Sequence, residues 1–297
     1  MSGIEAQTWD RRILPRRGLF DIPLRELWRY RDLIWLLARR NITAQYKQTV
    51  LGPLWFIIQP LATTLVFSLV FGRFANIGTD GVPHFLFYMS GLVVFAYFSD
   101  VVNKTSVTFT RNAQLFGKVY FPRLAVPLSQ TLTSLSTFAI QFGVFFLGLL
   151  FYLAKMHWFP DAQHPLHVHP NWRILFFPLF LLQVTMLGLG VGFIVAALTT
   201  RYRDLQMGIG FALQLWMYAS SVVFSLRDIQ GANADLYRNI LKWNPMVPVI
   251  EGFRFAFVGK GMVSQMDFAI SCGISVVVFC VGILMFSRTE QTVMDTV

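Results

Sequence analysis

The sequence predicts an all-α integral membrane protein with six transmembrane helices, an amphipathic N-terminal helix at the membrane interface and a re-entrant external hairpin before the last span. Hydrophobic residues make up 55% of the 297 residues and charged residues only 13%, whereas soluble domains carry about 25% charge. The apolar residues gather in runs long enough to cross ~30 Å of hydrocarbon. Ten of the 25 Lys and Arg residues precede the first run. This basic excess indicates a cytoplasmic N-terminus and attraction to anionic lipids rather than to nucleic acid.

The segment ahead of the first span divides into two parts. Residues 1–23 lack periodicity and are expected to form a basic cytoplasmic tail. In residues 24–48, apolar side chains recur at three- and four-residue intervals with arginines among them. This pattern predicts an amphipathic interface helix with Trp28 and Trp35 at headgroup level. A helix packed on a protein partner is the alternative, and both descriptions can hold at once.

The first apolar run covers residues 51–71 and carries no charge. Pro53 lacks a backbone N–H and suits the first turn of a helix, and it disfavours helical geometry at Gly52. We therefore expect the chain to break at Gly52 and the first span to cover about 53–75.

Five further spans complete a predicted transmembrane domain over residues 53–287. We expect them at about 84–103, 127–154, 172–200, 205–225 and 267–286. With six spans both termini share one side, and the segments on that side hold 17 basic residues against 8 on the other. The positive-inside rule then places both termini in the cytoplasm.

Residues 233–257 contain two short, partly apolar segments separated by Asn244 and Pro245. Each is too short to cross a membrane. They fit either a re-entrant hairpin or a pair of helices on the outer surface, and periodicity alone does not separate the two. Glu251 and Arg254 are three residues apart on one helical face and can pair.

Polar side chains follow single helical faces in several predicted spans. Interhelical hydrogen bonds, worth about 0.6 kcal/mol each, would explain a single such stripe. Two stripes accompanied by aromatic residues favour a polar translocation path. Such aromatic residues can form a stacking surface for sugar rings, because apolar sugar faces pack on aromatic planes. The candidate path residues are Trp55, Phe56, Gln59 and Thr63 in the first span and Gln206, Gln214, Met217 and Ser221 in the fifth. A further stripe in the third span consists of Gln130, Ser134, Thr137 and Gln141.

The sequence lacks the motifs that several kinds of chemistry require. The chain has no GxxxxGK[ST] phosphate loop and no pair of intramembrane carboxylates that would serve a proton relay. The histidines at 157, 164, 167 and 169 fit no zinc spacing, so we predict a solvated external loop there and no metal site. We predict no catalytic residues. A membrane-embedded glycosyl or acyl transferase ranks low, because the clusters at 157–169 and 251–254 have no evident partners.

The order and spacing of four segments resemble the ABC-2 type permeases. These segments are LGPLWFIIQPL after the surface helix, FPR at the end of the segment after the second span, the short RYRD turn, and WNPMVPVIEGFR before the last span. The similarity covers about residues 24–287 and is strongest to the subgroup that exports O-antigen, capsular polysaccharide or teichoic acid.

The resemblance implies a homodimer in the bacterial cytoplasmic membrane, docked on two separate ATP-binding cassette subunits. Those partners would bind ATP and Mg, so this chain would need no cofactor and would not be an enzyme. Its substrate would be a lipid-linked polysaccharide, and the alternative is a small hydrophobic molecule or drug. Residues 104–123 would couple to the ATPase and 233–257 would form an external gate. The candidate coupling residues are Arg111, Leu115, Phe116, Lys118, Tyr120 and Arg123, and the candidate gate residues are Asn244, Pro245, Glu251 and Arg254.

Overall fold

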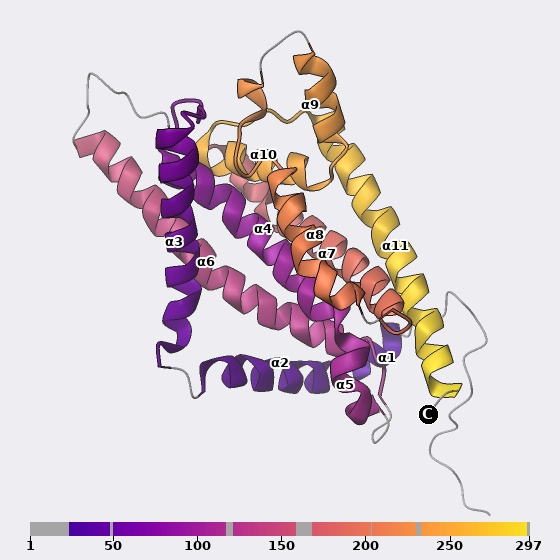
Figure 1. Ribbon diagram of the computed structural model, residues 1–297. Helices are drawn as coiled ribbons and strands as arrows, with labels where there is room; N and C mark the ends of the chain where they lie inside the picture. Colours follow the sequence, from indigo (N-terminus) through magenta and orange to yellow (C-terminus); the bar gives the residue numbers. More distant parts are fainter. Residues whose placement is uncertain are drawn as a thin grey trace, which may run out of the picture.

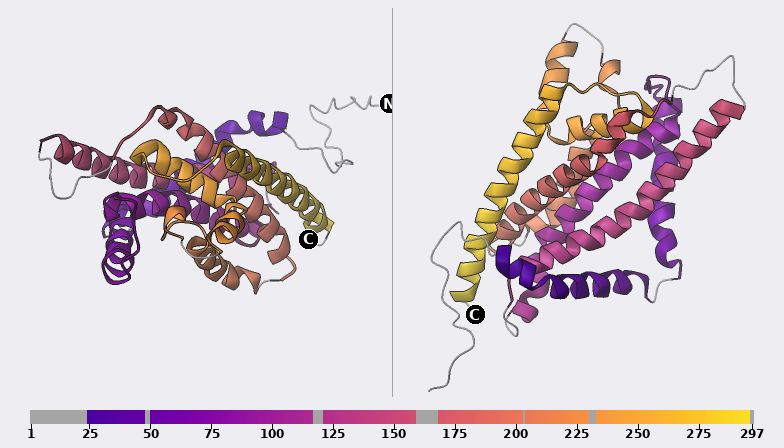
Figure 2. Two further views of the ribbon diagram at one scale, coloured as in Figure 1. Left: turned by 90° about the horizontal axis from the view of Figure 1, so that it is seen from above. Right: turned by 180° about the vertical axis from the view of Figure 1, so that it is seen from behind.

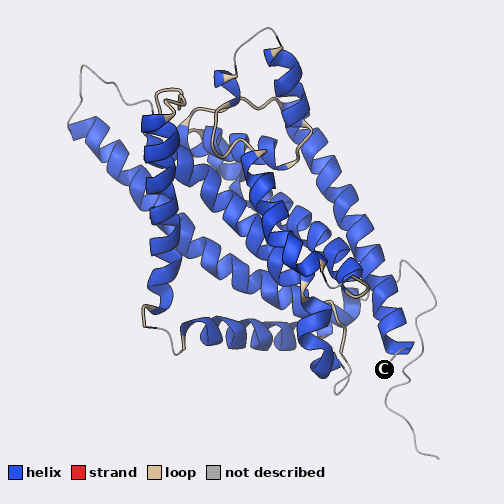
Figure 3. Ribbon diagram, viewed as in Figure 1, coloured by secondary structure: helices blue, strands red, loops and turns tan. Residues whose placement is uncertain are grey.

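The computed structural model describes residues 24–47, 50–116, 121–158, 168–202, 204–229 and 233–295 (Figure 1). Within these ranges the chain is helical and contains no strand (Figure 3). The predicted tail, residues 1–23, lies outside the described residues. The α-helices are α1 (Leu24–Arg29), α2 (Arg31–Tyr46), α3 (Trp55–Phe67), α4 (His84–Ser106), α5 (Thr108–Phe116), α6 (Ala125–Trp158), α7 (Phe177–Thr199), α8 (Leu205–Tyr218), α9 (Ala234–Lys242), α10 (Met246–Val258) and α11 (Gln265–Asp295).

Five of the described helical segments are long and apolar enough to cross a membrane. They are Gly52–Phe74, His84–Ser106, Ala125–Trp158, Trp172–Thr199 and Gln265–Glu290. They correspond to the first four predicted spans and the last. The first includes a 3₁₀ turn before α3 and the π-helical turn Ser68–Phe74 after it, and the fourth begins with the 3₁₀ turn Trp172–Phe176.

The fifth predicted span, about 205–225, is helical only in its first part. Helix α8 has only 14 residues and ends at Tyr218. Beyond it, side chains take up the backbone carbonyls that a longer helix would use. Asn244 Nδ2 donates to the Ala219 carbonyl at 3.0 Å, and an Arg254 nitrogen donates to the Ser221 carbonyl at 3.0 Å. The segment 219–225 is therefore non-helical but almost entirely buried.

The predicted break before the first span is confirmed. Gly52 has φ of +50°, a left-handed conformation that glycine adopts without strain. The chain turns there from α2, which lies across one end of the molecule, into the upright α3 (Figure 1). The predicted interface helix is divided between α1 and α2. Ala38 is fully buried on the face of α2 that packs on α6, while Trp28 and Trp35 are exposed.

Helix α4 is the central helix of the bundle and is largely buried. It contacts α3, α6, α7, α8 and α10. Two glycines of α7 face it: a Cβ at Gly188 would lie 3.0 Å from Val101, and one at Gly192 would lie 2.6 Å from Thr105. Small residues here allow the two backbones to approach, as is common between membrane helices.

The segment 233–257 forms two helices with different surroundings. Helix α9 is exposed, with Leu236, Tyr237 and Ile240 among its exposed apolar residues. Helix α10 is buried along its length except for the partly exposed Phe255. It lies at the end of the molecule away from α2 and packs on α4, α7 and α11 (Figures 1 and 2). Helix α10 therefore does not fit the alternative of two helices lying on the outer surface.

Candidate functional site

A polar cavity of about 330 Å³ lies between α3, α4 and α6. Each of these three helices contacts the other two. The wall is lined by side chains from all three helices, namely Phe56, Gln59, Pro60 and Thr63 of α3, Leu92, Ala96, Tyr97, Ser99, Asp100 and Asn103 of α4, and Ser134, Thr137, Phe138 and Gln141 of α6. Hydroxyl and amide groups thus alternate with aromatic rings around one intramembrane space.

The predicted path residues include none of the α4 side chains that line this cavity. Ser99, Asp100 and Asn103 recur at the three- and four-residue spacing of one helical face. That spacing is the signal in the sequence that could have identified them. The Asp100 carboxylate accepts a hydrogen bond of 2.6 Å from Lys104, so the wall carries a paired charge. The cavity therefore presents polar groups without an uncompensated carboxylate.

The predicted path residues divide among three environments. Phe56, Gln59 and Thr63 line the cavity, while Trp55 is exposed beside it. Gln206, Gln214 and Met217 lie on α8, on the other side of α4 from α3 (Figure 1), and Gln214 is exposed. The prediction that Ser221 shares their helical face is wrong, because α8 ends before it and Ser221 is completely buried.

The Asn244 side chain joins the end of α8 to the start of α10. Its Oδ1 accepts from Trp216 Nε1 at 2.9 Å and from the Met246 backbone N–H at 3.1 Å. Its Nδ2 donates to the Ala219 carbonyl and to Ser220 Oγ. The neighbouring Pro245 carbonyl accepts from Ser271 Oγ of α11 at 2.6 Å. The turn between α9 and α10 is thereby fixed to two other helices.

Glu251 and Arg254 form the predicted ion pair, with 2.8 Å between Glu251 Oε1 and Arg254 Nη1. Both side chains are buried, at 0% and 1% exposure. Glu251 Oε2 also accepts from the Met262 N–H at 2.8 Å. The Arg254 guanidinium lies 3.8 Å from the Phe87 ring centroid, and it donates to Ser90 Oγ of α4 at 3.3 Å and to the Ser221 carbonyl. This network connects α10 with α4, with the segment after α8 and with the loop before α11.

The predicted coupling segment contains the kinked helix α5, with Asn112 in a non-helical conformation. Arg111 is exposed. Phe116 instead contacts Phe109 and Phe121, and the Arg123 guanidinium lies 5.2 Å from its ring. Arg123 is buried and donates to the Glu290 carbonyl at 3.1 Å, and burial lowers the pKa of its guanidinium. Lys118 and Tyr120 fall outside the described residues, as does the Leu115 side chain.

Two carboxylates approach each other at the end of the molecule away from α2. Asp80 accepts from Ser225 Oγ at 2.8 Å and lies 4.0 Å from Arg227. Burial and, to a smaller extent, the charge of Asp80 raise the pKa of the Asp228 carboxyl. Within the described ranges no group of three or more His, Cys, Asp or Glu side chains could hold a metal ion.

Several helices long and apolar enough to cross a membrane, with a polar cavity among them, are typical of a membrane transport protein. The chain belongs to the ABC-2 type transporter family, whose model matches residues 32–258. It is similar to two O-antigen export system permease proteins named RfbA. The one from Myxococcus xanthus is 28% identical over 270 residues, covering 90% of this chain and 96% of that protein. The one from Klebsiella pneumoniae is 22% identical over 262 residues, covering 87% and 92%. The polysialic acid transport protein KpsM of Escherichia coli is 23% identical over 261 residues, covering 88% and 94%.

Proposed function

We propose that this chain is the permease subunit of an ABC transporter that exports a lipid-linked polysaccharide across the cytoplasmic membrane, driven by ATP hydrolysis in a separate subunit. The polar cavity between α3, α4 and α6 is the observation that carries the proposal. Sugar hydroxyls require hydrogen-bond partners inside the membrane, and aromatic rings accommodate the apolar faces of many sugars. The export of O-antigen and polysialic acid by the relatives supports the same substrate class.

The contacts at the two ends of α8 support a proposed topology of six crossings. Ser106 and Thr199, at the ends of α4 and α7, are hydrogen-bonded, and α8 begins a few residues after Thr199. Ser225 bonds to Asp80, which lies in the loop between α3 and α4 at the opposite end. The chain thus runs the length of the bundle between residues 204 and 225. Non-helical backbone at membrane depth is tolerated when protein buries it, as at 219–225. The charge bias of the sequence supports a cytoplasmic location for both termini.

The hairpin formed by α9 and α10 is proposed to be re-entrant and to act as an external gate. The Pro245 carbonyl bonds to Ser271, which lies six residues inside α11, about 9 Å from its first residue at 1.5 Å per residue. The other end of α10 contacts the segment that precedes α7, where the His169 N–H donates to the Val258 carbonyl at 3.0 Å. These contacts support the proposal that the Asn244–Pro245 turn is the deeper end of the hairpin.

Two copies of the chain are proposed to enclose the path. Helix α3 buries only Pro60, Thr64 and Phe67, and Leu213 is the buried residue of α8. These helices flank α4 and carry the remaining path residues, including Gln59 and Gln214. A second subunit facing them would bring the α3 and α8 stripes of both copies around one channel, which a polymer longer than the membrane thickness requires.

Glycan export in cells tests the function. In a strain that lacks this permease and retains its ATPase, Gln59→Leu and Gln214→Leu together should reduce surface glycan about tenfold or more and accumulate lipid-linked glycan inside, with dimer assembly unchanged. Gln59→Asn with Gln214→Asn retains both amides and serves as the matched control. Wild-type surface glycan in a strain without the permease, combined with loss of efflux of a small apolar compound, would favour the drug-exporter alternative.

A further inference from the structure

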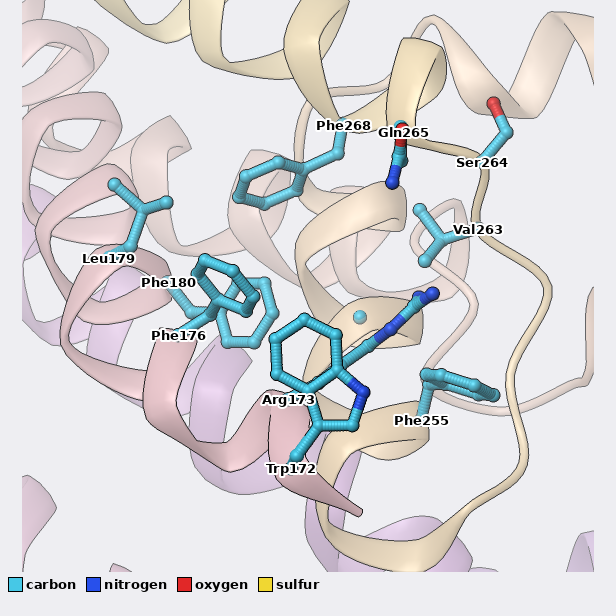
Figure 4. A pocket seen from close by; sticks show the side chains of 11 residues that line it. Trp172, Arg173, Phe176, Leu179, Phe180, Phe255, Val263, Ser264, Gln265 and Phe268 are labelled. Carbon is cyan, nitrogen blue, oxygen red and sulfur yellow. The ribbon is translucent and has the colours of Figure 1, made fainter.

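A second cavity, of about 300 Å³, shares no lining residue with the polar one and has a more apolar wall. It is enclosed by the 3₁₀ turn Trp172–Phe176 and the start of α7, by α10, and by the loop and first turn that begin α11. Figure 4 shows the rings of Phe176, Phe180 and Phe268 around its centre, with Arg173 and Phe255 on the opposite side. Most of the wall is carbon. The volume is at the lower end of the range of about 300–1,000 Å³ that ligand pockets occupy.

The guanidinium of Arg173 is the charged group at this cavity. It lies 4.7 Å from the centroid of the Phe255 ring. In the part of the chain that the structure describes, it makes no salt bridge and no side-chain hydrogen bond. The nearby Asp267 carboxylate is paired with Lys242 at 2.9 Å instead. An arginine with free donors beside an apolar space suits an anion that carries a hydrocarbon tail, because the guanidinium fork matches phosphate oxygens.

The position of the cavity along the spans specifies the kind of amphiphile. Trp172 and Gln265 are the first residues of two candidate membrane spans, so the cavity lies where the hydrocarbon core meets the headgroups. Leu175, Leu179 and Met266 are exposed around it, and such apolar surface at this level faces lipid. The rim residues Ser264 and Gln265 add a hydroxyl and an amide at headgroup level.

From these features we infer that the cavity binds one membrane phospholipid, with the phosphate on Arg173 and an acyl chain among the phenylalanine rings. The chain would rest over Gly252, where a Cβ would lie 3.0 Å from Phe180. Gly252 directly follows Glu251 of the buried ion pair. A bound lipid would therefore support α10 from the side opposite α4. This site is separate from the proposed glycan path.

Photo-crosslinking in nanodiscs tests the inference. The wild-type protein is exposed to a phosphatidylglycerol whose acyl chain carries a diazirine, and the crosslinked peptides are identified by mass spectrometry. Crosslinks should concentrate on residues 176–180 and 263–268. Arg173→Gln should reduce them about tenfold, the effect of losing one charge-assisted interaction. Arg227→Gln removes an exposed arginine outside the cavity and should leave the pattern unchanged.

A second variant separates loss of the site from loss of folding. Val263→Trp fills the cavity from the loop without changing a helix, and it should abolish the crosslinks while gel filtration of the protein is unchanged. A diazirine fatty alcohol, which lacks the phosphate, should label the same peptides weakly and equally in wild type and Arg173→Gln. Crosslinks spread evenly over α3 and α6, or unaffected by both substitutions, would overturn the inference by indicating surrounding lipid only. Displacement by maltose would overturn it in favour of a sugar site.

Discussion

The indole Nε1 of Trp216 donates a hydrogen bond of 2.9 Å to the side-chain oxygen of Asn244. One residue is near the end of α8 and the other precedes α10, so this bond joins a proposed path helix to the proposed gate. Three further hydrogen bonds satisfy the remaining polar groups of the Asn244 amide. Any displacement of α10 relative to α8 must break several of these bonds together.

We expect Asn244→Leu to lower the free energy of unfolding by about 2–3 kcal/mol, since each lost hydrogen bond contributes about 1 kcal/mol and the indole N–H loses its partner. Thermal unfolding of the purified protein measures the change. Asn239→Leu on the exposed face of α9 is the matched control and should be nearly neutral. In liposomes Asn244→Leu should also raise leakage of a small solute, and equal leakage in both variants would contradict a gating role.

The buried ion pair should respond differently to one substitution than to two. Glu251→Ala leaves Arg254 charged and buried, so we expect a loss of about 3–5 kcal/mol. Replacing both residues, as in Glu251→Leu with Arg254→Met, removes the charges together and should restore much of that stability. Asp235 and Arg238 form a pair with the same spacing in which Asp235 is exposed, and Asp235→Ala should cost less than about 1 kcal/mol. Similar costs for Glu251→Ala and Asp235→Ala would contradict the described burial.

The coupling prediction needs different substitutions from those that the sequence suggests. Phe116→Ala should reduce stability by about 2 kcal/mol, because the ring packs within the chain and its loss leaves a gap. It therefore does not isolate contact with an ATPase. Arg111→Glu changes an exposed group on α5 and should weaken copurification of the ATPase while leaving thermal stability unchanged. Undiminished copurification and export would remove Arg111 from the interface.

The carboxylates near residue 80 give a pH dependence. The pKa of Asp228 is raised above its ordinary value of 3.8 by burial and by Asp80. The folded protein therefore binds this proton more tightly than the unfolded chain, and the contribution of Asp228 to stability is lost as pH rises through the raised pKa. Asp228→Asn removes that loss. The difference in unfolding midpoint between Asp228→Asn and wild type should grow as the pH rises above about 4, whereas the corresponding difference for Asp235→Asn should not. A constant difference would contradict the shift.

Labelling of single cysteines tests the six crossings and their orientation. In a background with Cys272→Ser and Cys280→Ser, Ala75→Cys and Asn233→Cys should react with an impermeant maleimide in intact cells. Tyr202→Cys should react only after the membrane is opened. All three positions are exposed. Ala75 is preferable to Gly78, where a side chain would meet the Asp228 carboxylate at 2.9 Å. Labelling of Tyr202→Cys in intact cells would contradict the topology.

The sequence predicts features that depend on local chemistry. The glycine–proline pair at 52–53 marks the true start of the first span, and the i, i+3 spacing of Glu251 and Arg254 predicts their ion pair. The end of α8 depends on Asn244 and Arg254, which bond to carbonyls more than 20 residues earlier in the chain. Periodicity contains no information about such distant partners. For the same reason the sequence does not show that α4 completes the polar cavity, or that Phe116 and Arg123 pack within the chain.

The length of α6 has a consequence for the bilayer. Its 34 residues extend about 51 Å at 1.5 Å per residue, whereas the hydrocarbon core is ~30 Å thick. The diagonal course of α6 beside the upright α3 (Figure 1) absorbs part of this excess as tilt. Phe146, Leu147, Leu150 and Phe151 remain exposed well toward its C-terminal end. A thinner bilayer would leave these side chains in water or force a larger tilt of α6 from the bilayer normal. Either change costs fractions of a kcal/mol per Å of mismatch. Because α6 also forms one wall of the polar cavity, we expect the width of that cavity, and with it the export rate in liposomes of graded acyl length, to vary with membrane thickness.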